Sequence, residues 1–415
     1  MGNGRHIAGG LLGAGRSNLG TITTLDVIDQ LYARGNVCAV KMNPVNDYLG
    51  PFYEKIFSEF ISRGWLRFVY GGADVGGHLA HHRKVDAVHM TGSAATYDAI
   101  VWGTDNQAAT RKANNAPILA KPITAELGGV TPLIVVPGDW SEADVRFQAE
   151  HIATTKLINC GHNCNATQVL VVSQDRPLTD KLVAEVGKVI RDAEPRPTYY
   201  PRSDEKIHKA CNGMSAEFLN ADRSRVLIPD VDPRGGASIL KEEVFASVIG
   251  VVRLPGKTPR EFLRNAVDFA NDVLPGTLGA VVSSTPRSAS RTRRPSTKRF
   301  PACPTARSAS TSGPGWPLLW RLGARSPAIR HSTSAAAPEW CTTPSCCRSP
   351  QKAVVEIPFR PSPRSILNGE LTLSPKPVFF TTNKTAQTTI RRLVKFYVNG
   401  NPVALPGIFV SALRG

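Results

Sequence analysis

Short, β-branched apolar runs alternate along the first third of the chain with longer stretches whose apolar residues recur at helical spacing. The runs at residues 37–40, 66–70, 87–90 and 132–136 have the length and composition of buried strands. Between the first two, residues 47–63 carry apolar side chains three and four positions apart, which predicts a helix. Strand, helix and strand at this period predict a parallel sheet covered by helices.

A second region of the same kind follows, from about residue 140 to residue 255. Helices are predicted at residues 141–157 and 178–191, with a strand at 168–172 between them and another near 248–254. Further strands are predicted at 354–359 and 377–382, and a helix at 385–396. The pattern therefore predicts two α/β domains rather than one.

The stretch between residues 284 and 350 has a different composition. Nearly half of it is Ser, Thr or Pro, eleven residues up to position 351 are Arg or Lys, and only Glu339 is acidic. Such a segment buries too little apolar surface to offset the entropy lost on ordering, so we expect disorder.

The net charge of +17 is confined to the end of the chain. Residues 1–283 hold 30 basic and 30 acidic side chains, whereas residues 284–415 hold 20 and 3. A protein that grips nucleic acid is expected to carry its charge across the binding face. Few aromatic side chains accompany the basic stretch, chiefly Trp316, Trp320 and Trp340, so we do not expect nucleic-acid binding.

The eight cysteines follow no spacing typical of a disulfide framework or a zinc site, so we expect reduced thiols and no metal. The apolar runs are too short to span a bilayer, and the first residues lack the apolar core of a signal peptide. These features predict a cytoplasmic protein with no membrane partner.

Residues 159–164, Asn-Cys-Gly-His-Asn-Cys, contain the most distinctive candidate for chemistry. A thiolate is the best side-chain nucleophile near neutral pH when its pKa is lowered and it is partly accessible. The polar, Gly-containing surroundings favour a nucleophile at Cys164. The alternative is a pair of buried cysteines that act as small apolar residues.

This segment resembles the nucleophile motif of aldehyde dehydrogenases, Asn-x-Gly-Gln-x-Cys, with His162 in place of Gln. Residues 125–132, Ala-Glu-Leu-Gly-Gly-Val-Thr-Pro, resemble the family's second motif, and Glu126 stands 38 residues before Cys164. The resemblance implies that Cys164 attacks the aldehyde and that Asn159 shapes the site. It implies that Glu126, free to swing on two glycines, accepts a proton from the thiol or the hydrolytic water.

The resemblance also assigns a role to Asn18, which lies 18 residues before Asn36. Gly35-Asn36-Val37 resembles the family's entry to a lysine-bearing strand, and the asparagine upstream of it supports the oxyanion together with the Cys164 N–H. The alternative is a turn residue in a Gly-rich loop. Gly13-Ala14-Gly15 suggests a dinucleotide fingerprint, but we expect no strong strand before it and no such role.

Three further segments resemble the family's cofactor site, which implies NAD or NADP. Lys41 matches the lysine that holds the adenosine ribose, and Gly92 and Ser93 match a Phe-Thr-Gly-Ser loop whose helix N-terminus meets the pyrophosphate. In residues 242–245, Glu-Glu-Val-Phe, Glu243 matches the residue that grips the nicotinamide ribose, followed by Phe245.

Two departures leave the choice of cofactor open. Pro44 stands where members that prefer NAD often carry a Glu for the ribose 2′-hydroxyl, and Tyr97 stands where a second glycine usually follows Gly-Ser.

The resemblance covers residues 25–285 and returns from about residue 359 to 415. An N-terminal part of the family's sequence has no match here, and residues 286–349 match nothing in the family. We interpret that stretch as an out-of-frame translation, since GC-rich codons in a shifted frame yield Arg, Ser, Pro and Ala. The alternative is an authentic disordered basic insert.

The expected fold is α/β, with a Rossmann-like parallel-sheet cofactor domain, a second α/β catalytic domain and a partly disordered C-terminal third. The expected boundaries are residues 1–137 for the cofactor domain, 138–283 for the catalytic domain, 284–351 for the basic segment and 352–415 for the C-terminal part of the fold.

The resemblance implies oxidation of an aldehyde to a carboxylic acid with NAD(P), through a cysteine thiohemiacetal and a thioester. The substrate is a small-molecule aldehyde, and the family implies a homo-oligomer. One alternative is a catalytically impaired remnant. Another is an acylating dehydrogenase that uses CoA, against which Glu126 argues.

We predict that the encoding DNA, read in another frame across residues 284–351, continues the family's sequence. A frame-corrected version is then expected to be more soluble than the chain as given and to oxidise aldehydes faster, because the shifted stretch leaves apolar faces uncovered. The test compares the solubility of the two versions and their rates of NAD(P) reduction with a panel of aldehydes. Comparable activity in the two versions would show that the stretch is a tolerated insert.

Overall fold

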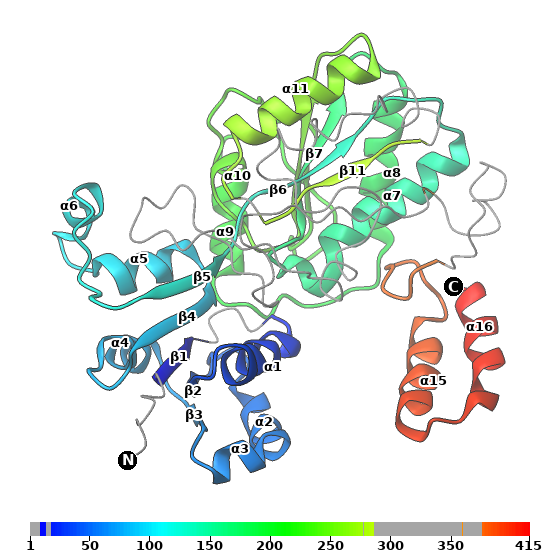
Figure 1. The fold of residues 1–415 in the computed structure, drawn as a ribbon. Helices are drawn as coiled ribbons and strands as arrows, with labels where there is room; N and C mark the ends of the chain where they lie inside the picture. The colour runs from blue at the N-terminus through cyan, green and yellow to red at the C-terminus, as the bar shows by residue number, and fades with distance from the viewer. Residues whose placement is uncertain (1–8, 14–17, 277, 286–358, 360–375) are drawn as a thin grey trace, which may run out of the picture. The chain divides into compact units, whose positions relative to one another are not determined.

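The structure is a computed structural model that describes residues 9–13, 18–276, 278–285, 359 and 376–415 (Figure 1). The described residues form two compact units, the first ending at Gly128 and the second beginning at Gly129. The basic stretch at 286–349 lies outside the described residues, as does the strand predicted at 354–359 except for Phe359.

A five-stranded parallel sheet forms the first unit, in the order β3-β2-β1-β4-β5. Its strands are β1 (Gly9–Gly13), β2 (Val37–Lys41), β3 (Leu66–Val69), β4 (Ala87–Gly92) and β5 (Ile123–Leu127). The predicted strands at 37–40, 66–70 and 87–90 are confirmed. The expectation that no strand precedes Gly13-Ala14-Gly15 is wrong, because β1 pairs with β2 on one side and with β4 on the other.

Helices cover both faces of this sheet. They are α1 (Gly20–Ile28) with a π-helical turn (Asp29–Ala33), a 3-10 turn (Asp47–Leu49), α2 (Gly50–Ile56), α3 (Ser58–Ser62), α4 (Ala73–His81), α5 (Ala94–Trp102) and α6 (Ala108–Ala113). Val27 of α1 packs with Val40 of β2 on one face, and Ala80 of α4 packs with Val88 of β4 on the other. The helix predicted at 47–63 is interrupted at Phe57, whose backbone leaves the helical region.

The second unit contains a six-stranded sheet in the order β11-β6-β7-β10-β9-β8. Its strands are β6 (Thr131–Val135), β7 (Thr167–Ser173), β8 (Glu217–Phe218), β9 (Val226–Ile228), β10 (Val248–Leu254) and β11 (Val281–Ser283). All pairs are parallel except β8 with β9. The strands predicted at 132–136, 168–172 and 248–254 are confirmed.

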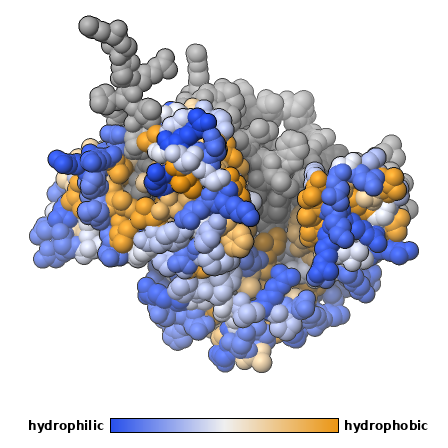
Figure 2. Space-filling model, turned by 90° about the horizontal axis from the view of Figure 1, so that it is seen from below, coloured by the Kyte–Doolittle hydropathy of each residue, from blue (hydrophilic) through white to orange (hydrophobic). Residues whose placement is uncertain are grey.

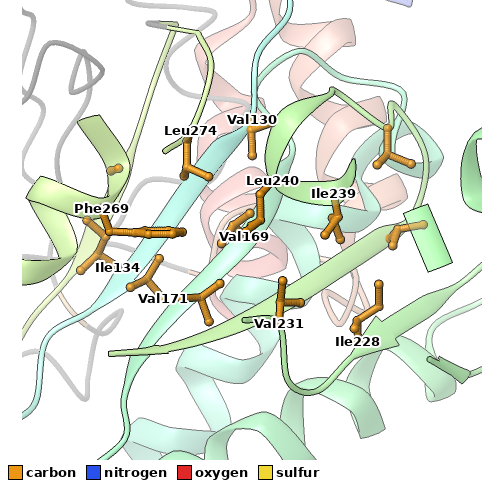
Figure 3. Packing of buried hydrophobic residues seen from close by; sticks show 14 of the residues in the cluster. Val130, Ile134, Val169, Val171, Ile228, Val231, Ile239, Leu240, Phe269 and Leu274 are labelled. Atoms are coloured by element: carbon orange, nitrogen blue, oxygen red, sulfur yellow. The ribbon is translucent and has the colours of Figure 1, made fainter. Parts of the chain in front are cut away.

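Two helical layers enclose the second sheet. They contain α7 (Glu142–Leu157), α8 (Leu178–Asp192), α9 (Ser203–Cys211), α10 (Ser238–Lys241) and α11 (Pro259–Asp272). Because side chains alternate along a strand, Val169 and Val171 of β7 face α11, with Phe269 beside them (Figure 3). Leu170 and Val172 face α7 and α8 instead. This three-layer arrangement confirms the predicted fold class.

A helical hairpin of α15 (Ala386–Asn399) and α16 (Leu405–Leu413), joined by a 3-10 turn (Pro402–Ala404), ends the chain. It confirms the helix predicted at 385–396. Exposed apolar side chains lie on it next to hydrophilic ones, as the orange and blue patches of Figure 2 show; the most exposed include Tyr397, Val398, Val403 and Phe409. In the part of the chain that the structure describes, no helix is long and apolar enough to cross a bilayer.

The strand predicted at 377–382 is wrong, since these residues form turns. Phe380 N–H donates to the Pro377 carbonyl at 3.0 Å, and Asn383 N–H donates to the Phe380 carbonyl at 2.9 Å. The segment is held instead by side chains on α7. The Phe380 ring stacks on Phe147 with centroids 5.4 Å apart, and Lys376 pairs with Glu150 at 2.9 Å.

Candidate functional site

The candidate residues of the first unit lie along one edge of its sheet, where the parallel strands end. Lys41 is the last residue of β2, Gly92 ends β4, and Glu126 is the penultimate residue of β5. Asn18 follows β1 and is buried, with an exposed fraction of 8%. Strand order reverses at β1, between β2 and β4, and in such sheets ligands bind beyond the carboxyl ends at this switch point.

Lys41 extends its aliphatic stem over α4. Its Cδ and Cε lie 3.9 Å from the position that a Cβ would take at Gly76, which is an ordinary van der Waals distance. Burial lowers the pKa of the Lys41 ammonium, and the carboxylates of Asp74 and Asp47 oppose that effect. The ammonium is therefore held near the end of β2 by packing as well as by charge.

Gly92 and Ser93 carry the chain from β4 directly into α5. Ser93 is the N-cap residue, and its hydroxyl accepts a hydrogen bond from the Thr96 N–H at 3.1 Å. The first N–H groups of an α-helix have no acceptor within the helix, and such an N-terminus binds phosphate groups well.

Glu126 lies inside a strand, not in the turn between the two sheets. It pairs in register with Thr91 of β4, and only 3% of its surface is exposed. The second of the two glycines after it has a packing role, because a Cβ at Gly129 would come within 2.9 Å of the Gly276 Cα. Whether these glycines let Glu126 swing stays a prediction.

In the second unit, the fold brings together the two motifs that precede β7 and β10. These strands are neighbours, with Gly250 opposite Val169. The entry to β7 contains the Asn-Cys-Gly-His-Asn-Cys segment, and the entry to β10 contains Glu243 and Phe245. Segments about 80 residues apart in sequence therefore meet at the amino end of one sheet.

The backbone just before Cys164 is strained, and at Gly161 it closely approaches the other motif. Asn159, Cys160 and Gly161 all have positive φ, at 54°, 55° and 75°. A Cβ at Gly161 would lie 2.4 Å from the carbonyl carbon of Ala246 and 2.7 Å from the Ser247 nitrogen. Non-glycine residues adopt this conformation at a cost of about 1–2 kcal/mol each, and such strain concentrates at functional sites.

His162, which replaces the family's Gln, ties the two motifs together. It is fully buried, and its Nδ1 donates to the Phe245 carbonyl at 2.7 Å. Its ring also contacts Tyr199 edge-on at 4.9 Å and Tyr200 at 5.4 Å. Burial lowers the pKa of His162, so the neutral ring is favoured. His162 therefore makes a hydrogen bond across the two motifs.

Cys164 lies at the end of this segment, with 5% of its surface exposed. Its carbonyl accepts a hydrogen bond from the Thr131 hydroxyl at 3.4 Å, which joins the segment to β6 as well. Burial raises the pKa of three other thiols: Cys160, Cys211 and Cys38, the last to about 12 with help from Asp29. None of these three is thereby favoured as a thiolate near neutral pH.

Asn159 also stabilises the segment at residues 159–164 through hydrogen bonds of its side chain. Its amide donates to the His162 carbonyl at 3.1 Å and to the Tyr199 hydroxyl at 2.7 Å. These bonds fit the shaping role that the family motif implies for Asn159.

Lys156, near the end of α7, is a buried ionisable residue that no sequence motif indicated. The side chain is 1% exposed, and its Nζ donates to the Ala246 carbonyl at 2.9 Å. Burial lowers the pKa of this ammonium to about 7, while Glu243 acts to raise it. A lone lysine in the otherwise uncharged run from Ile152 to Cys164, apart from His162, was the signal that could have revealed it. Within the described ranges, no cluster of His, Cys, Asp or Glu could hold a metal ion.

Comparisons with known proteins agree with these motifs. Residues 22–201 match the model of the aldehyde dehydrogenase family. The chain is 27% identical over 257 residues to N-succinylglutamate 5-semialdehyde dehydrogenase of Sphingopyxis alaskensis, an alignment that covers 56% of this chain and 48% of that protein. The chain thus spans about half the length of the curated relatives it matches.

Solved structures show the same fold. An aldehyde dehydrogenase of Mycobacterium tuberculosis complexed with NAD+ is similar with a TM-score of 0.54 and 19% identity, over 74% of this chain and 62% of that one. The NADP complex of an NADP-dependent glyceraldehyde-3-phosphate dehydrogenase of Bacillus halodurans gives 0.51 and 20%, over 68% and 57%. At these identities the likeness concerns the fold alone.

Replacing Gly161 by Ala is expected to destabilise the second unit far more than the same change at Gly213. Both glycines have a φ near 75°, but a Cβ at Gly213 would have no neighbour within 4 Å. Gly213→Ala therefore measures the conformational effect, about 1 kcal/mol, and Gly161→Ala adds a backbone collision worth about 1–3 kcal/mol more. Chemical unfolding followed by circular dichroism measures both. Equal losses in the two variants would show that the approach to Ala246 can relax freely.

The lowered pKa of Lys156 predicts a pH dependence of stability. Between about pH 7 and its ordinary value of 10.5, the unfolded chain binds a proton at this residue that the folded chain does not. Stability contributed through Lys156 therefore rises with pH across this window.

Lys156→Met removes this titration, so the melting temperature of the native protein relative to the variant is expected to rise between pH 7 and pH 9.5. Lys188→Met, at an exposed position of α8, is the matched control and should show no such trend. Scanning fluorimetry over the pH range measures the melting temperatures. A difference in melting temperature between the native protein and Lys156→Met that does not change with pH would contradict the lowered pKa of Lys156.

Proposed function

The chain belongs to the aldehyde dehydrogenase superfamily, and from this premise we propose that it oxidises an aldehyde to a carboxylic acid with NAD or NADP. The substrate would be a small-molecule aldehyde. The observation that carries the proposal is the contact between the two motifs before β7 and β10. It gathers a cysteine, a tethering histidine and the Glu-Glu-Val-Phe segment at one sheet edge.

Cys164 is proposed as the nucleophile. Its thiolate would attack the aldehyde carbon and form a thiohemiacetal, with the oxyanion supported by the Asn18 amide and by the Cys164 N–H. Support comes from the strained backbone at Asn159 and Cys160. Hydrogen bonds from Asn159 and from His162 hold this segment in place, so Cys164 would be held in a fixed position.

Glu126 is proposed as the base of the second half-reaction. After oxidation, a water molecule would pass a proton to Glu126 while it attacks the thioester, and the Cys164 thiolate would leave as the acid is released. A buried strand position supports this role, because it keeps bulk water from competing for the carboxylate. The presence of Glu126 also argues against transfer of the acyl group to CoA.

The residues at the carboxyl edge of the first sheet fit a dinucleotide. The N-terminal turn of α5, entered through Gly92 and capped by Ser93, suits the pyrophosphate, and the packed Lys41 ammonium suits a ribose hydroxyl. Glu243 and Phe245 are proposed to hold the nicotinamide end. NAD(P) would supply the hydride acceptor when bound. Pro44 and Tyr97 leave both cofactors possible.

A second candidate is a catalytically impaired member of the same family. It is favoured by residues 286–349, which match none of the family's motifs and carry one acidic residue among many basic ones. An impaired chain would keep the fold described above but turn over poorly.

The proposed roles are tested by replacing Glu126 with Gln. This variant is expected to release about one equivalent of reduced cofactor in a rapid burst and then to turn over slowly, with deacylation reduced about 10²–10⁴-fold. Stopped-flow absorbance at the nicotinamide band follows both phases.

Cys164→Ser should abolish the burst, and Glu142→Gln, at an exposed carboxylate of α7, should behave like the native protein. Loss of both burst and turnover in Glu126→Gln would place Glu126 in binding rather than in deacylation. A folded native chain without any burst would support the impaired candidate.

A further inference from the structure

His89 is a buried titratable residue that the proposed reaction does not use. It lies in the middle of β4, with 8% of its surface exposed. Its Nδ1 lies 2.8 Å from the Thr124 hydroxyl of β5, and its Nε2 lies 3.7 Å from an Asp26 carboxylate oxygen on α1. Asp26 is itself buried, at 5% exposure. A histidine and an acid buried together need compensation for the water that they lose.

The sheet register places this pair on the same face as Glu126. His89 is opposite Thr124, and Thr91, two residues further along β4, is opposite Glu126. Alternate residues of a strand share a face, so His89 and Glu126 are diagonal neighbours across two adjacent strands. Val88 and Met90 point to the opposite face, where they pack beside Ile100 of α5.

The charges around His89 favour its protonated form. Burial lowers the pKa of His89, whereas the carboxylates of Asp26 and Glu126 raise it. The two carboxylates together outweigh burial, so the pKa is raised overall. Arg34 acts to lower it, and its guanidinium is bound to Asp29 at 2.6 Å. The groups that face the imidazole are thus Asp26 from α1, Thr124 and Glu126 from β5, and Arg34 beyond the end of the π-helical turn. An imidazolium here has the buried carboxylates of Asp26 and Glu126 as its charged neighbours.

We propose that His89, held by Asp26, is a positioning residue for Glu126 that keeps this carboxylate charged and ready to accept a proton. The proposal rests on the proposed role of Glu126 as base. Without a positive charge at position 89, Asp26 and Glu126 would repel each other in a buried space, and one of them would take up a proton. A protonated Glu126 cannot accept a proton from water, so thioester hydrolysis would slow.

The first test uses His89→Asn, which can still hydrogen bond to Thr124 but carries no charge. The burst of reduced cofactor, which precedes deacylation, should keep its amplitude. Steady-state turnover at pH 6.5 should fall about tenfold, and the acid limb of the pH–rate profile should move up by about one unit. At pH 9 the variant and the native protein should converge, because excess base then keeps the carboxylates ionised.

A double variant separates a charge effect from a purely structural one. In His89→Asn with Asp26→Asn, the repelling carboxylate is also removed, so the acid limb should return toward its native position. A structural role predicts the reverse, since two disrupted contacts in one cluster would slow turnover at least as much as one. A double variant no faster at pH 6.5 than His89→Asn would overturn the proposal.

A measurement that needs no turnover keeps the proposal distinct from the function on which it rests. The His89 ring proton is identified by NMR as the resonance missing in His89→Asn, and its titration midpoint is compared between the native protein and Glu126→Gln. Loss of the Glu126 charge should lower the midpoint by about half a unit or more. An unchanged midpoint would refute the coupling. A lowered midpoint in a chain without any burst would uphold the coupling and refute the proposed oxidation.

Discussion

The close approach of Gly161 to Ala246 and Ser247 is the constraint on which the second unit's candidate site depends. Parallel strands about 4.8 Å apart bring their entry loops together, and only a residue without a Cβ fits at the point of contact. The two residues before it, Asn159 and Cys160, also have left-handed backbone conformations. The bonds from His162 to the Phe245 carbonyl and from Lys156 to the Ala246 carbonyl then fasten the two loops on either side of it.

In the first unit the corresponding constraint is the alternation of side chains between the two faces of the sheet. Residues of β4 and β5 that face α5 are apolar and pack beside Ile100. His89, Thr91 and Glu126, at alternate positions, lie on the opposite face and are polar or ionisable although they are buried. One sheet thereby provides an apolar face that stabilises the fold and a polar face on which charges can be held out of water. Asn18 lies in the segment that connects β1 to α1, beyond the carboxyl end of this sheet.

Both units hold buried ionisable groups, and in both the surroundings set their charge. Lys156 has one carbonyl as acceptor and Glu243 as a charged neighbour, and burial prevails, so its pKa falls to about 7. His89 faces two carboxylates, and their attraction prevails over burial, so its pKa rises. Such groups destabilise a fold unless they are compensated, which makes them more informative about function than the basic charges at the end of the chain.

The sequence by itself determined the main elements and the identity of the motifs, because both are recorded locally. Period and composition identified strands such as residues 168–172 and the helix that became α7, and the motifs at Glu126 and Cys164, in that order, resembled those of the family. Local pattern failed where tertiary contacts outweigh propensity. The Gly-Leu run of β1 is a central strand because two neighbours pair with it, and residues 377–382 form turns because α7 binds their side chains. Only the tertiary structure could pair β7 with β10 and so bury Lys156 and set Gly161 against Ala246, because strand pairing depends on partners that lie far away in the sequence.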